Sequence, residues 1–205
     1  MKEKILLRLF SILFPVKEVR TERERKAFTN AWYSVWLEEE YTDSDEPIVE
    51  KYAKYDDFST DLLVKFMGII PAGTMRIIKD NEKGLPTIND FDIKEGPWKE
   101  SRVSEVTLLT VSKRFRKRTF KGLTFAVLMK VLYKHIRKNN LRGIVIAADK
   151  RLFYSLTKRI KLPFSKIGEG KFYEGSITIP AYMDMQNFDE IFAQNNPLIF
   201  DFVFR

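Results

Sequence analysis

Apolar runs alternate along the chain with polar segments, and their spacing separates strands from helices. Alternation or short continuous β-prone runs predict strands over residues 16–20, 61–66, 74–78, 105–111, 143–148, 171–180 and 198–204. Apolar positions at helical spacing predict helices that begin after Thr21, span about 120–138 and span 152–160. A strand meander followed by alternating helices and strands predicts a mixed α+β or α/β domain, with a central mixed sheet flanked by helices.

Local signals mark where these elements begin and where loops interrupt them. Thr21 followed by Glu24 is a capping-box pattern that opens the first long helix. The acidic stretch 38–50, broken by Pro47, predicts a loop. Residues 79–100 are polar and too many for an ordinary connection, so we expect a lid or a binding loop there.

An apolar segment at residues 5–14 precedes the first predicted strand. It is much shorter than the roughly 20 residues that a membrane-spanning helix needs. Arg8 interrupts it, and Pro15 follows it in place of a cleavage pattern. We expect residues 1–15 to form an apolar helical extension that docks on one domain of residues 16–205. Peripheral contact of residues 2–14 with a membrane is the open alternative, so we expect a cytoplasmic protein that could also associate with membranes.

The composition excludes several classes of chemistry. The 205 residues are 44% hydrophobic, enough to bury a sizeable core, and they include no cysteine and one histidine. Disulfide frameworks, zinc ribbons and thiol nucleophiles are therefore excluded, and we expect no metal site. The histidine, His135, stands beside lysine and arginine without an evident carboxylate partner, so we assign it no catalytic role.

The net charge of +8 is concentrated in one block of the chain. Residues 101–161 hold 17 lysines and arginines but only two acids, Glu105 and Asp149, for a net charge of +15. The remainder holds 19 bases and 26 acids, for a net charge of −7. This asymmetry indicates an anionic partner for the middle block.

The basic turn before the long helix is the most informative segment. Six cations and no acid occupy residues 113–121. A helix N-terminus exposes unpaired N–H groups and binds phosphate, so the segment from Arg116 to Gly122 is a candidate phosphate site. A merely solvated basic helix start is the alternative.

The order of these motifs resembles the GNAT acyltransferases. The strand Glu105–Val111, the Arg-rich turn Phe115-Arg116-Lys117-Arg118 and the later Phe153-Tyr154 stand in the order of that family. The resemblance is greatest to long-chain N-acyl amino acid synthases, relatives of the acyl-homoserine-lactone synthases. The motifs of that branch are Tyr55-Asp56-Asp57, Gly73-Thr74-Met75-Arg76, Ile167-Gly168 to Tyr173-x-Gly175, Pro180, Asp184 and Asn196-Pro197. Together they cover about residues 16–205.

The resemblance implies transfer of an acyl group from a phosphopantetheine thioester to the amine of an amino acid or similar small amine. No cofactor would be permanently bound. The donor-binding residues would be Leu109, Thr110, Val111, Arg116, Lys117, Arg118, Thr119, Phe120, Lys121 and Gly122. The family's turn usually has glycine where this chain has Lys117, Thr119 and Lys121, which disfavours a deeply cradled coenzyme A and favours an acidic acyl carrier protein. Coenzyme A as the carrier remains open, and Leu108 stands where the branch tends to have arginine.

The resemblance also implies catalytic roles. Glu105 would act as the general base for direct amine attack, N–H groups near Leu109 to Val111 would hold the oxyanion, and Tyr154 would protonate the leaving thiolate. The alternatives are an ion pair of Glu105 with Arg102 or Arg76, and a core role for Tyr154.

The acceptor and acyl-chain residues are a third set of expectations. Arg76, with Asp56 beside it, would hold an acceptor carboxylate, and pairing of Arg76 with Asp56 or Asp57 is the alternative. Phe28, Trp32 and Trp36 would wall an acyl tunnel, and plain core packing is their alternative.

Two other functions compete with the acyltransferase. The basic block would suit a nucleic-acid-binding module, although RNP, GXXG and zinc-finger motifs are absent from the sequence. A catalytically inactive acyltransferase-like domain that binds an acyl carrier is the other alternative.

Overall fold

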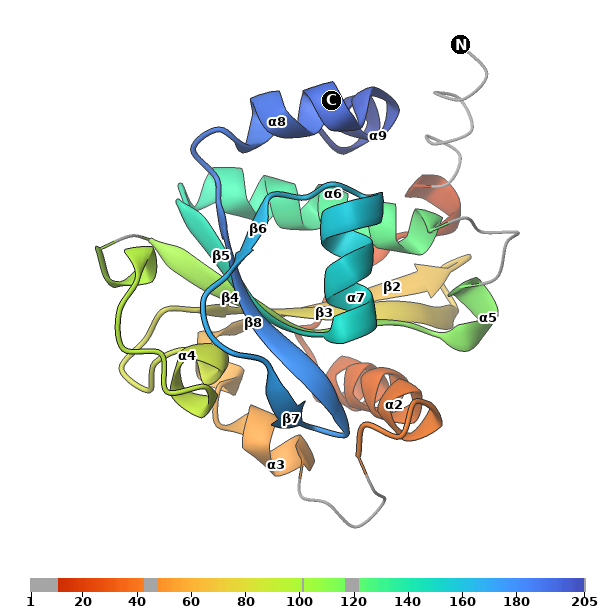
Figure 1. The fold of residues 1–205 in the computed structure, drawn as a ribbon. Helices are drawn as coiled ribbons and strands as arrows, with labels where there is room; N and C mark the ends of the chain where they lie inside the picture. Colours follow the sequence, from red (N-terminus) through yellow and green to blue (C-terminus); the bar gives the residue numbers. More distant parts are fainter. Residues whose placement is uncertain (1–10, 43–47, 101, 117–121, 205) are drawn as a thin grey trace.

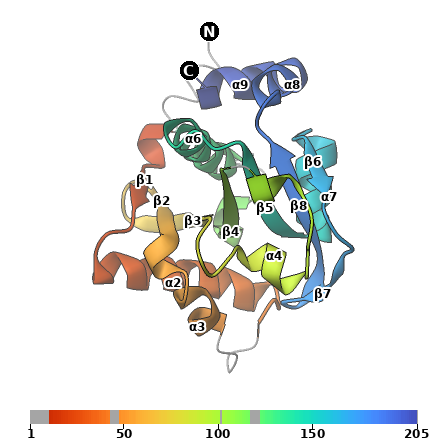
Figure 2. The ribbon, with the colours of Figure 1, turned by 90° about the vertical axis from the view of Figure 1, so that its left-hand side faces the viewer.

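The computed structural model describes residues 11–42, 48–100, 102–116 and 122–204. Its centre is an eight-stranded mixed sheet with the order β1-β2-β3-β4-β5-β8-β6, and β7 pairs with β8 (Figures 1 and 2). The strands are β1 (Val16–Glu18), β2 (Ser59–Phe66), β3 (Ile70–Lys79), β4 (Val103–Val111), β5 (Gly143–Asp149), β6 (Phe164–Lys166), β7 (Lys171–Tyr173) and β8 (Ser176–Asp184). The β4–β5 pair is parallel and the other pairs are antiparallel. The predicted central mixed sheet flanked by helices is therefore confirmed.

Helices cover both faces of this sheet. α6 (Leu123–Lys138) lies on one face, with α8 (Phe188–Asn195) and α9 (Pro197–Phe204) outside it, whereas α2 (Glu22–Glu38) and α3 (Ile48–Ala53) lie on the other (Figures 1 and 2). The remaining helical segments are η1 (Asp56–Phe58), α4 (Pro86–Asp90), η2 (Pro97–Glu100), α5 (Lys113–Arg116), α7 (Lys150–Tyr154) and the π-helical turn η3 (Ser155–Arg159). No helix within the described residues is both long and apolar enough to cross a membrane.

The predicted start of α2 is confirmed. The Thr21 side chain accepts a hydrogen bond from the Glu24 N–H, and the Glu24 carboxylate accepts one from the Thr21 N–H. Two orphan N–H groups are thereby satisfied. Further along α2, Phe28, Trp32 and Trp36 are buried against the sheet.

The two central strands β4 and β5 separate soon after they begin. They pair only from Val103 to Glu105 on β4 and from Gly143 to Val145 on β5. Both strands continue, and β4 shifts register against β3 near Leu108, which has a φ of +48°. A leucine in the left-handed region marks a local distortion that the surrounding packing must hold. Because β4 bends there and leaves β5, a gap opens inside the sheet.

The main core fills the space between the sheet and α6. Leu128 and Ile136 of α6 pack against Ile77 of β3 and Ile144 of β5. The helix predicted from the spacing of apolar positions is therefore confirmed, and these positions face the core. The helix begins at Leu123, after the Gly122 N-cap in the left-handed conformation, about three residues later than predicted.

Three predictions made from the sequence were wrong, incomplete or tested only in part. The apolar run 198–204 lies within the helix α9, not in a terminal strand, and Pro197 opens it at the position where proline suits a helix. A short apolar run does not by itself distinguish a buried helix from a strand. The stretch 79–100 contains α4 and η2 and packs Leu85 and Trp98 into a second core cluster. Of the predicted N-terminal helix, residues 11–13 are helical and residues 1–10 lie outside the described part of the chain.

Candidate active site

A cavity of about 480 Å³ occupies the gap between β4 and β5. Glu105, Thr107 and Leu109 of β4 and Ile146 and Ala148 of β5 line it. It runs through the sheet, because its lining includes side chains from both faces. We distinguish three parts of this cavity by their lining residues. The polar end is lined by Glu105 and Glu174, the donor side by Gly122 and Leu123, and the apolar end by methionine and phenylalanine side chains near the C-terminus.

Glu105 stands where the two strands separate, at the polar end. Its side chain is almost fully buried, and its carboxylate accepts hydrogen bonds from the Thr87 N–H (2.9 Å) and the Thr87 hydroxyl (2.8 Å). Burial raises the pKa of Glu105 to about 8, against the lowering effect of the Thr87 hydrogen bonds. The nearby carboxylates of Asp90 and Glu174 raise it further. A carboxyl group with this pKa can exchange a proton near neutral pH. Within the described residues, the hydrogen bonds of Glu105 come from Thr87 and not from Arg102 or Arg76, so the alternative of an ion pair with either arginine is not observed.

A second carboxylate, Glu174, lines the same end of the cavity. It accepts a hydrogen bond from the Lys51 ammonium (2.8 Å) and from the Tyr52 hydroxyl (3.1 and 3.2 Å to its two oxygens). Lys51 also pairs with Asp90 (3.1 Å) and donates to the Tyr173 hydroxyl (2.5 Å). Burial is the largest influence on Glu174 and leaves its pKa raised, although its hydrogen bonds act in the opposite direction. Burial also holds the pKa of Tyr52 well above its usual value, so this hydroxyl stays protonated as a donor.

Sequence reasoning missed Glu174, Lys51, Tyr52 and Thr87. They come from three separate segments, and only the fold brings them together. One local signal was available in the sequence, the glycine that directly follows Glu174. The two residues form the two-residue turn between β7 and β8, and both have positive φ (+49° and +71°). Such a turn favours Asn, Asp or Gly, so a glutamate there is unusual.

The donor side of the cavity is formed at the start of α6. Gly122 and Leu123 line the cavity there, and Gly122 caps the helix without a side-chain hydrogen bond. Leu109 also lines the cavity. Arg116 lies close by on α5, where its guanidinium donates to the Val111 carbonyl (2.5 Å) and to Glu39 (2.5 Å). The predicted donor residues Lys117, Arg118, Thr119, Phe120 and Lys121 lie outside the described residues.

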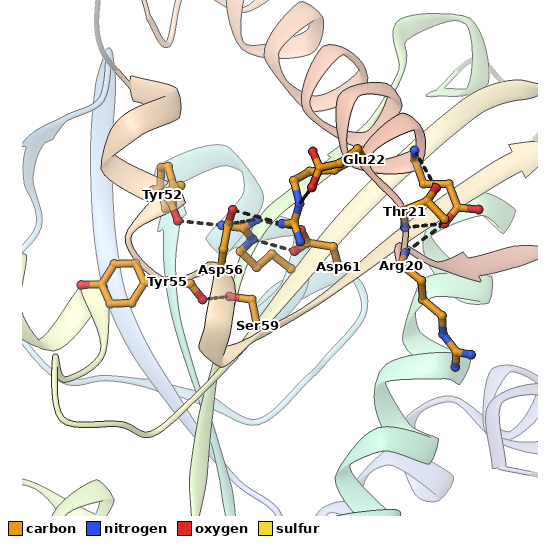
Figure 3. Close-up of polar contacts among 11 residues, drawn as sticks. Arg20, Thr21, Glu22, Tyr52, Tyr55, Asp56, Ser59 and Asp61 are labelled. Carbon is orange, nitrogen blue, oxygen red and sulfur yellow. Dashed lines mark hydrogen bonds and ion pairs between the residues drawn. The ribbon is translucent and has the colours of Figure 1, made fainter.

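Arg76 does not have the free guanidinium that holding an acceptor carboxylate requires. It is 4% exposed and forms a two-pronged pair with Asp61, with distances of 2.6 and 2.7 Å. It also contacts Asp56 (2.8 Å) and donates to the Tyr52 carbonyl (2.7 Å). Figure 3 shows Asp56, Asp61 and Tyr52 around this group of contacts. Of the two acid partners predicted as the alternative, Asp56 is observed and Asp57 is not. The main partner is Asp61, which faces Arg76 across the β2–β3 ladder and was not predicted.

The predicted aromatic residues occupy different places. Trp36 lines the cavity, whereas Phe28 and Trp32 are buried behind it in a cluster with Leu108 and Tyr52. Phe28 and Trp32 therefore pack in the core, which was the alternative to their forming the wall of an acyl tunnel. Tyr154 is 56% exposed, so the core alternative does not describe it, although its neighbour Ser155 lines the cavity.

The apolar end of the cavity lies on the α6 face, beneath the C-terminal helices. Its walls come from β8 and the segment after it, from α8 and from α9. They are Met183, Met185, Phe188, Phe192 and Phe202. Sequence reasoning assigned none of these to the acyl chain. Within the described part of the chain, no group of acidic or histidine side chains could hold a metal ion.

Comparisons with known proteins identify the fold. No family model matches the sequence, and no curated protein matches it. The structure is similar to that of FeeM, an N-acyl amino acid synthase from uncultured soil microbes, with a TM-score of 0.73 and 16% identity over 87% of this chain and 93% of that one. It is also similar to the AHL synthase LasI, with a TM-score of 0.59 and 10% identity over 90% of this chain and 95% of that one. A GNAT-family acetyltransferase from Staphylococcus aureus Mu50 matches with a TM-score of 0.53 and 15% identity over 84% of this chain and 99% of that one. The chain therefore has the GNAT fold, as its motifs predicted.

Proposed function

We propose that this protein is an N-acyltransferase that transfers a long-chain acyl group from a phosphopantetheine thioester to a small amine. The observation that carries the proposal is the position of Glu105. Its buried carboxyl group lies where β4 and β5 separate, on the wall of a cavity that also reaches the start of α6. The GNAT fold of the chain and the N-acyl amino acid synthase among its structural neighbours support this reading.

In this proposal the acyl donor binds with its phosphate at the N-terminus of α6. The positive helix end and the basic turn favour a phosphate there, and the pantetheine arm would lie between β4 and β5. Leu109, Thr110, Val111 and residues 116–122 would make the donor contacts. The basic block would dock an acidic acyl carrier protein, and acyl-coenzyme A is the other form of the same thioester chemistry.

The acceptor would react by direct attack. A neutral amine attacks the thioester carbonyl and forms the C–N bond, Glu105 accepts the amine proton, and the C–S bond breaks as the thiolate leaves. Beyond Glu105, the edge of β4 no longer pairs with β5, and N–H groups near Leu109 to Val111 would hold the oxyanion. Tyr154 would return a proton to the thiolate, and Tyr154→Phe tests that assignment separately.

The acyl chain would extend into the apolar end of the cavity. Burying each CH₂ contributes about 0.8 kcal/mol, so an apolar cavity gives affinity for a chain without polar contacts. The chain would then lie on the α6 face of the sheet, and Trp36 would form another part of the cavity wall. Phe28 and Trp32 would support that wall from behind.

The test is acyl transfer by the purified protein. Myristoyl-carrier protein and myristoyl-coenzyme A are incubated with a mixture of small amines and amino acids, and the products are identified by mass spectrometry. We expect an N-acyl product, and we expect Glu105→Gln to lower the rate by about 10²-fold or more. Glu95→Gln, on an exposed side chain, is the matched control. Folded wild type that yields no N-acyl product from either donor would contradict the proposal, and an unchanged Glu105→Gln rate would remove the general-base role.

A further inference from the structure

We propose that Glu174 selects the acceptor, and that the preferred acceptor is an amine that binds in its ammonium form, releases one proton to solvent before it attacks, and has no carboxylate next to its amino group. This inference rests on the proposed N-acyltransferase function, and it narrows the acceptor from small amines in general to one chemical class.

Glu174 sits in a strained position that turns its carboxylate inward. It is one of two central residues in the β7–β8 turn, with a φ of +49°, which a glutamate adopts only against a steric penalty. Its side chain is nevertheless 15% exposed and lines the cavity together with Glu105. The following Gly175 is required, because a Cβ atom there would lie 2.3 Å from the Glu40 carbonyl oxygen.

Fixed partners hold this carboxylate in place. The Lys51 ammonium lies 2.8 Å from Glu174, and the Tyr52 hydroxyl donates to both of its oxygens. Lys51 also pairs with Asp90 and donates to Tyr173, so its three protons are engaged. Lys51 does not line the cavity, whereas Glu174 does. The cavity therefore meets the acid and not the base of this pair.

The polar end offers no cation to an acceptor carboxylate. Of the described residues, Arg159 is the one lysine or arginine that lines the cavity. It is the last residue of η3, and the next residue, Ile160, packs against the main core. Arg76 is buried and engaged by Asp61 and Asp56. The Glu174 carboxylate, joined by Glu105 when it is ionised, would repel an acceptor carboxylate and attract an ammonium group. This is selection by an unfavourable contact as well as a favourable one.

The test compares amino acids with their decarboxylated amines. Tyrosine and tyramine, and ornithine and putrescine, differ only by the carboxyl group. We expect wild type to acylate each amine with a kcat/KM at least tenfold above that of its amino acid. Glu174→Gln should reduce this ratio at least tenfold, mainly through a higher KM for the amine, while exposed Glu190→Gln leaves it unchanged.

Calorimetric binding of the same compounds, without donor, separates the two proposals. If wild type prefers the amine in binding and Glu174→Gln loses that preference, the inference stands even where no acyl transfer is found. If transfer occurs but tyrosine or ornithine is the better acceptor, the inference fails and the proposed function survives. Equal binding of amine and amino acid, or a ratio unaffected by Glu174→Gln in a variant with the wild-type circular dichroism spectrum, also overturns it.

Discussion

Glu105 is the residue whose chemistry depends most on its surroundings. In water a glutamate is ionised at neutral pH, but here burial raises its pKa to about 8. Thr87 keeps the ionised form accessible by donating to both carboxylate oxygens.

This raised pKa predicts a pH-dependent stability. Between about pH 4.5 and about pH 8, unfolding would release the proton that Glu105 holds in the folded protein, so the free energy of unfolding should fall as the pH rises. Glu105→Gln should flatten this decrease. Urea denaturation at several pH values measures it, with exposed Glu95→Gln as the control. An equally steep decrease in Glu105→Gln would show that this carboxyl group does not titrate as described.

Arg76 provides a residue-scale prediction about stability. Replacing it with methionine would leave the buried Asp61 carboxylate without its two-pronged partner. Breaking a buried ion pair from one side costs about 3–5 kcal/mol, and we expect a loss of stability in that range. Urea denaturation at pH 7 measures it. A cost below about 1 kcal/mol, comparable to that of an exposed pair, would contradict the structural role.

At the scale of elements, the sequence predicted those features that depend on interactions between residues close together in the chain. The capping box at Thr21 and the buried stripe of α6 depend on residues within one or two turns, and both are as expected. The 198–204 run was assigned to a strand because its apolar residues satisfy either structure. What decides between them is packing, and Phe202 is buried in the main core next to α6.

The candidate site was less predictable, because its members meet only through the sheet register. Arg76 and Asp61 become neighbours through the pairing of β3 with β2, which the strand sequences do not specify. Glu174 meets Lys51 and Tyr52 from segments more than 100 positions away in the chain. Glu105 was accessible to sequence reasoning because an acid at the start of a buried strand stands out in a basic block.

The position of the C-terminal helices predicts control of acyl-chain length. Each methylene that fits the apolar end should tighten donor binding about fourfold, the equivalent of about 0.8 kcal/mol, until the cavity is full. Met185→Phe adds volume to its wall and should shift the preferred chain to a shorter length. Ile191→Phe, on an exposed position of α8, is the control. Relative kcat/KM values for C8 to C16 donors measure the shift, and an unchanged length profile in Met185→Phe would place the chain elsewhere.

At the scale of the whole molecule, basic and acidic side chains lie in different places, one near the proposed donor site and the other near the proposed acceptor site. Positive charge gathers in residues 101–161, which include α5 and the start of α6 on the donor side. At the polar end, Tyr52 of α3 and Thr87 of α4 line the cavity together with Glu105 and Glu174. Opposite signs at the two ends would bring an anionic donor and a cationic acceptor to one carbonyl from different directions.

This division predicts that salt will distinguish the two donor forms. An acidic carrier protein would contact the basic surface over a wide area, whereas coenzyme A would contact mainly the turn, so screening should weaken the carrier protein more. We expect the KM for an acyl-carrier protein to rise at least tenfold between 50 and 500 mM NaCl, and the KM for the matching acyl-coenzyme A to rise less.

A double variant tests the same contact at low salt. Lys113→Glu combined with Arg114→Glu, on exposed positions of α5, should raise the KM for the carrier protein, while Lys94→Glu, outside the basic block, should not. Equal salt dependence of the two donors, or no effect of the double variant, would mean that the basic block does not dock a carrier protein.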